Sequence, residues 1–121
     1  MLRLFWVGLI SFICATASLA QVATQSADGA VLRALDKFSG DVVDILIPSR
    51  SSTQFGPLTI TLTDCRFPEG NPAGNAYAGL EITDPAKEEV LFQGWMVASS
   101  PALSAMEHPR YDIWVLRCAN S

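Results

Sequence analysis

A short C-terminal segment holds the side chains that could perform catalysis. Ser99, Ser100, His108 and Asp112 lie within fourteen residues of one another, and serine, histidine and aspartate are the components of a nucleophilic triad. The serines stand in an Ala-Ser-Ser-Pro sequence rather than in the Gly-x-Ser-x-Gly turn that exposes a nucleophile, and a serine before Pro101 is typical of a helix N-cap. We therefore predict no catalytic residue, with a small hydrolase that uses Ser100 and His108 as an alternative.

The same segment could also hold a metal ion, through Glu107, His108 and Asp112. Zinc sites prefer several histidine or cysteine ligands, and this chain has a single histidine. We therefore predict no metal and no cofactor. The other role for this stretch is a rigid turn at His108-Pro109, in which Glu107 and His108 bond backbone groups or each other.

The N-terminus has the three parts of a secretory signal peptide. Arg3 is followed by an uncharged run, residues 4–20, which ends in small side chains. A membrane span needs about 20 strongly apolar residues, and this run weakens from Cys14 onwards. We predict cleavage after Ala20, a periplasmic location and a mature form without a membrane span. Retention of the segment as an anchor is the alternative.

The predicted export changes the number of cysteines in the mature chain and their expected chemistry. Removal of residues 1–20 takes Cys14 away and leaves Cys65 and Cys118 in a compartment that oxidises thiols. Because the chain has no Cys-x-x-Cys motif, we predict a structural disulfide rather than a redox or metal site. By the chain-entropy estimate, closing a loop of this length stabilises the fold by about 4 kcal/mol.

Charge argues against nucleic acid as a partner. The chain has twelve acidic and eight basic residues and a net charge of −4, and loss of Arg3 makes the mature part more acidic. Such a chain repels phosphate backbones. The remaining length fits one domain: residues 21–30 are small and polar and predict a flexible leader, and residues 31–121 predict a single β domain.

Short apolar stretches with β-branched residues or alternating polarity predict strands. The clearest is 58–63, where leucine and isoleucine alternate with threonine. No stretch has convincing helical periodicity, and only residues 101–106 could form a helical turn or two. The sequence predicts an all-β fold of six or seven short antiparallel strands with one short helical turn, in a small sandwich or a partly open barrel. The predicted strands are residues 31–35, 42–47, 58–63, 76–83, 90–97 and 111–118.

The C-terminal segment also has a recognisable pattern. Residues 94–118 read GWMVASSPALSAMEHPRYDIWVLRC. With Leu35-Asp36-Lys37, Phe55-Gly56-Pro57-Leu58 and Cys65, they resemble a proteobacterial exported family, the domain of unknown function DUF2155. The resemblance implies a small, single-domain periplasmic protein without an established activity. It also implies a gene neighbourhood, since alphaproteobacterial genes of the family tend to lie near one for an accessory or assembly subunit of respiratory complex I.

These observations favour a binding protein over an enzyme. We predict a non-catalytic binding or accessory module that contacts a protein partner in the cell envelope. An accessory or assembly partner of complex I is the alternative that the resemblance implies. Trp95 and Trp114 lie in predicted strands and are expected in the core, but an exposed Trp95 with Met96 would indicate a protein partner. The predicted contact residues are Trp95, Met96, Glu107, His108 and Tyr111.

Overall fold

The computed structural model describes Gly8 and residues 23–120. The predicted signal peptide, apart from Gly8, lies outside this part of the chain, as do residues 21, 22 and 121. Within the described part, no helix is long and apolar enough to cross a membrane.

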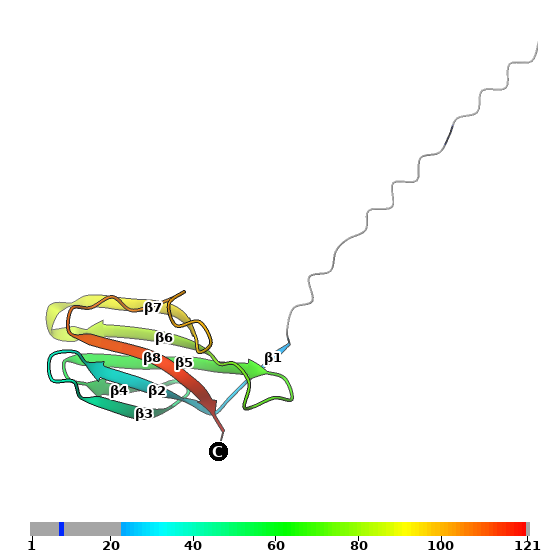
Figure 1. Cartoon of the computed structure of the whole chain (residues 1–121), viewed down its shortest axis with the longest axis horizontal. Helices are drawn as coiled ribbons and strands as arrows, with labels where there is room; N and C mark the ends of the chain where they lie inside the picture. Colours follow the sequence, from blue (N-terminus) through cyan, green and yellow to red (C-terminus); the bar gives the residue numbers. More distant parts are fainter. Residues whose placement is uncertain (1–7, 9–22, 121) are drawn as a thin grey trace, which may run out of the picture.

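The described residues form two antiparallel β-sheets that pack against each other (Figure 1). The larger sheet has the order β1-β5-β6-β7, with β4 also paired to β5, and the smaller sheet has the order β3-β2-β8. The predicted all-β fold is confirmed as a sandwich, because the two sheets do not close into a barrel. The elements are β1 (Thr24–Ser26), β2 (Gly29–Asp36), β3 (Val42–Pro48), β4 (Ser51–Phe55), β5 (Leu58–Pro68), β6 (Tyr77–Asp84), η1 (Pro85–Lys87), β7 (Glu89–Val97) and β8 (Tyr111–Ala119).

Alternating side chains build the core between the sheets. Neighbouring residues of a strand point to opposite faces, so the apolar residues at every second position of β5 turn inward and the threonines between them turn outward. Leu32 in β2 and Val115 in β8 meet this face from the other sheet. The six predicted strands are confirmed, with ends that differ by a few residues.

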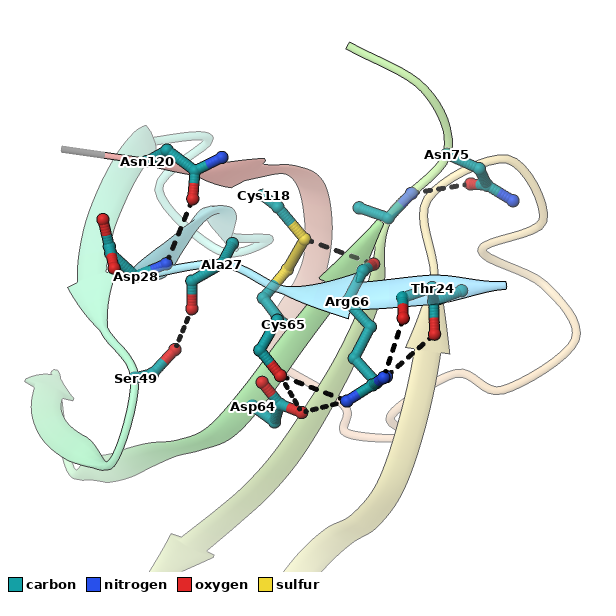
Figure 2. Close-up of a disulfide and its surroundings, with 12 residues drawn as sticks. Thr24, Ala27, Asp28, Ser49, Asp64, Cys65, Arg66, Asn75, Cys118 and Asn120 are labelled. Carbon is teal, nitrogen blue, oxygen red and sulfur yellow. Dashed lines mark hydrogen bonds and ion pairs between the residues drawn. A yellow bond between two sulfur atoms is a disulfide. The ribbon is translucent and has the colours of Figure 1, made fainter. Parts of the chain in front are cut away.

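The predicted disulfide between Cys65 and Cys118 is confirmed, and it joins β5 of the larger sheet to β8 of the smaller one (Figure 2). Cys118 Sγ also lies 3.3 Å from the carbonyl oxygen of Arg66. A bonded sulfur carries no proton, so this is a close contact rather than a donated hydrogen bond. The covalent link holds the two sheets together at the end of the sandwich where β1 begins.

The predicted flexible leader is wrong for residues 24–30. β1 pairs with the end of β5, Ala27 is buried, and β2 already begins at Gly29. The reason is a network around Arg66, which donates to the hydroxyl and carbonyl oxygens of Thr24 at 2.9 and 3.0 Å (Figure 2). Small polar side chains thus form a strand here because a distant arginine binds them.

The short helical turn lies at another place than predicted. It is η1, at Pro85–Lys87 in the connection between β6 and β7. Residues 101–104 form turns and a bend instead, with the Leu103 N–H donating to the Ser100 carbonyl oxygen at 3.1 Å. β4, like β1, is a strand that the sequence does not predict, because its Ser-Ser-Thr-Gln sequence gives no apolar signal.

Candidate binding surfaces

His108 holds the chain that enters β8. Its Nδ1 atom accepts hydrogen bonds from the backbone N–H groups of Arg110 at 3.0 Å and Tyr111 at 3.1 Å. Its carbonyl oxygen accepts from Lys37 Nζ at 2.6 Å. The predicted bonding of His108 to backbone groups is therefore confirmed. Glu107 is exposed beside it.

An ion pair fastens this turn to the connection between β2 and β3. Arg110 donates to both carboxylate oxygens of Asp36, at 3.1 and 2.9 Å, and this hydrogen bonding lowers the pKa of Asp36 to about 2. The guanidinium group also lies over the rings of Phe38 and Tyr111, at 5.1 and 5.2 Å. Two segments far apart in the sequence, 36–41 and 108–111, are thereby held together.

The geometry of His108 does not fit a catalytic triad. In a triad, Nδ1 donates its proton to the aspartate and Nε2 faces the serine, whereas here Nδ1 accepts two backbone protons. Ser99 is used elsewhere: its hydroxyl and N–H bond the side chain of Asn75, at 2.8 and 3.0 Å. A cleft of about 490 Å³ borders His108, Glu107 and Asp112, but neither serine lines it.

The described residues offer no ready metal site. No group of three or more histidine, cysteine, aspartate or glutamate side chains in Gly8 and residues 23–120 is arranged to hold an ion. Both cysteines of this part are bonded to each other.

The five predicted contact residues do not form one surface. Met96 is only 2% exposed, and Tyr111 is also buried, with its ring edge against Phe55 at 5.5 Å. Trp95 is 47% exposed on the opposite face of β7 from Met96. Adjacent residues of a strand point to opposite sides, so Trp95 and Met96 cannot present a joint surface.

The exposed apolar surface lies mainly on the β2–β3 hairpin instead. Phe38 and Leu46 are 71% and 68% exposed, and Val42 and Val43 are also exposed. β3 is the end strand of its sheet, and its pairing with β2 has no irregularity, so the backbone groups of alternate residues face an open edge. Val42 and Leu46 lie on one face of β3 and Val43 on the other. We call Phe38, Val42 and Leu46 the hairpin patch.

A smaller apolar surface lies in the connection between β7 and β8. Leu103 is 81% exposed, while Met106 is buried and anchors the loop. A cleft of about 310 Å³ lies beside this loop, and Trp114 forms part of its wall. The cleft is lined by Pro101, Ala102, Ala105, Asp112, Ile113 and Trp114.

Comparison with known proteins places the chain among bacterial proteins. A family model described as an uncharacterized protein conserved in bacteria, DUF2155, matches residues 30–118. The uncharacterized protein RP359 of Rickettsia prowazekii (strain Madrid E) is 34% identical over 88 residues, which cover 70% of this chain and 57% of the relative. The chain thus spans little more than half the length of that relative. No solved structure matches it significantly.

Proposed function

Since the chain belongs to the DUF2155 family of uncharacterized bacterial proteins, we propose that it is a non-catalytic binding module that contacts a protein partner through the hairpin patch. The observation that carries this proposal is the exposure of three large apolar side chains, Phe38, Val42 and Leu46, on one hairpin. Exposed apolar side chains that gather on one element are typical of protein contact sites.

The open edge of β3 adds to this argument. Native proteins protect edge strands with charges, bulges or short length. The pairings of β7 and β8 contain register shifts, and β1 and β4 are short. β3 has one charged side chain, Asp44, which is bonded to Arg33 of β2 at 2.8 Å. Its free edge is therefore suited to binding an extended segment of the partner.

The proposed place of action is the periplasm. Support comes from the signal-peptide pattern of residues 1–20 and from the disulfide, which is typical of oxidising compartments. The measurement is N-terminal sequencing of the protein from a periplasmic extract, with Gln21 expected as the first residue. Recovery of the protein in the cytoplasmic fraction alone would overturn this location.

Photo-crosslinking in intact cells tests the contact surface. A photoreactive side chain in place of Leu46 is expected to form a discrete adduct with an envelope protein. The substitution Val42→Asp should weaken that adduct, because a charge would have to be desolvated in an apolar interface. The matched control is the same photoreactive side chain in place of Val90, which is 60% exposed on β7.

Two outcomes contradict the proposal: equal adducts from positions 46 and 90, or an adduct at position 46 that Val42→Asp does not affect. Mass spectrometry of the adduct identifies the partner. A complex I subunit in the adduct would assign the module to that complex, whereas any other envelope protein would separate it from complex I.

A further inference from the structure

The outer face of the larger sheet differs chemically from the hairpin patch. Outward positions of β5 and β6 carry Thr61 and Glu81, which pair across the strands, and Glu81 pairs in turn with Gln93 of β7. Ser52 of β4 shares a 2.7 Å hydrogen bond with Thr61. Hydroxyl, carboxylate and amide groups therefore form a polar row across four strands.

Trp95 lies beside this row, against the backbone of Gly79. The two residues are cross-strand partners, and a Cβ atom added to Gly79 would lie 3.3 and 3.4 Å from the Cη2 and Cζ2 atoms of the indole. Gly79 is itself buried, while Trp95 remains 47% exposed. Glycine at position 79 thus lets the ring rest on the sheet, with much of its surface left open.

Thr63 fixes the other side of this arrangement. Its hydroxyl donates to the carbonyl oxygen of Gly79 at 3.0 Å, and it occupies the space that a side chain at position 79 would need. Because the indole rests on the backbone of Gly79, which Thr63 holds in place, the ring loses little conformational freedom when a ligand stacks on it. We call Trp95, Thr63, Thr61, Glu81 and Gln93 the Trp95 platform.

We propose that the Trp95 platform binds a neutral oligosaccharide, with one pyranose ring stacked on the indole. A pyranose has an apolar face of C–H groups that matches a flat aromatic ring, and hydroxyl groups around its rim that match Thr61, Glu81 and Gln93 as donors and acceptors. The acidic chain, with its net charge of −4, disfavours anionic polysaccharides. This site is independent of the hairpin patch.

Binding to two soluble probes, chitohexaose and cellohexaose, tests the proposal. In a Trp114→Phe background, Trp95 is the only tryptophan of the mature chain, so its fluorescence reports the platform directly. Saturable binding of at least one probe is expected, with a change in that fluorescence. By calorimetry in the wild-type background, Trp95→Ala should weaken binding about tenfold or more, Trp95→Phe should retain most of it, and Leu46→Ser should leave it unchanged.

Gly79→Val provides a second variant that keeps the indole. Its side chain should lift the ring from the sheet and weaken binding, while circular dichroism shows that the fold is kept. The proposal is overturned if the wild-type protein binds neither probe, or if Trp95→Ala binds as the wild type does. Loss of a protein crosslink in Trp95→Ala, with no carbohydrate binding by the wild type, would assign the platform to a protein partner instead.

Discussion

At the residue scale, the histidine of this chain is a structural acceptor. Replacement of His108 by alanine leaves the N–H groups of Arg110 and Tyr111 without their acceptor, and an unsatisfied, partly buried donor costs about 1–3 kcal/mol. We expect His108→Ala to lower the free energy of unfolding by about 1 kcal/mol or more, which is a fall in Tm of roughly 4–8 °C for a domain of this size.

The asparagine variant separates this role from chemistry. Asn carries a carbonyl oxygen near the position of Nδ1, so His108→Asn should recover part of the lost stability in thermal unfolding. A hydrolase would lose its turnover in both variants, because neither side chain is a base. If His108→Ala melts at the wild-type temperature, the accepting role of His108 is wrong.

Residue types alone could not predict which side chains face outward. Trp95 and Met96 are neighbours in one strand and both are apolar, so either could have faced the core. The register of β7 against β6 places Met96 opposite the buried Ala78 and Trp95 opposite Gly79, where the missing side chain leaves room for the indole. The bond between Cys65 and Cys118 was predictable because only these two cysteines remain once the predicted signal peptide is removed.

At the element scale, the link between β5 and β8 carries a quantitative expectation. Replacement of both cysteines, Cys65→Ala with Cys118→Ala, should lower the free energy of unfolding by about 4 kcal/mol, since the unfolded chain is then no longer closed into a loop. Denaturant titration of the oxidised wild type and of the double variant measures the difference. A reductant should bring the wild type close to the variant and leave the variant itself unchanged.

Equal denaturation midpoints for the oxidised wild type and the double variant would mean that the disulfide contributes no stability.

Two strands of the larger sheet have no signal in the sequence. Alternating polarity located six strands, but β1 and β4 are short and polar, and they form because β5 extends far enough to pair with both. Such strands depend on a neighbour and have no local signal of their own.

At the scale of the whole molecule, composition and periodicity predicted an all-β domain, whereas the division into two sheets needed the structure. The run Val42–Pro48 is apolar apart from Asp44, which is typical of a strand with both faces largely buried. It lies instead at the end of the smaller sheet with most of its side chains exposed. Edge position depends on strand order, which no local pattern encodes, and the hairpin patch could therefore not be predicted.

The attachment of β1 bears on how the predicted signal peptide would be cleaved. The Glu69 N–H donates to the carbonyl oxygen of Ala23 at 2.9 Å, so the fold grips the chain from Ala23 onwards. Only Gln21 and Val22 separate that grip from the predicted cleavage site, a reach of about 10 Å at full extension. If the predicted cleavage after Ala20 takes place, we expect signal peptidase to act before β1 docks on β5, or only after β1 has detached. If the N-terminal segment is instead retained as a membrane anchor, the disulfide end of the sandwich would lie close to the membrane surface and its far end would point into the periplasm.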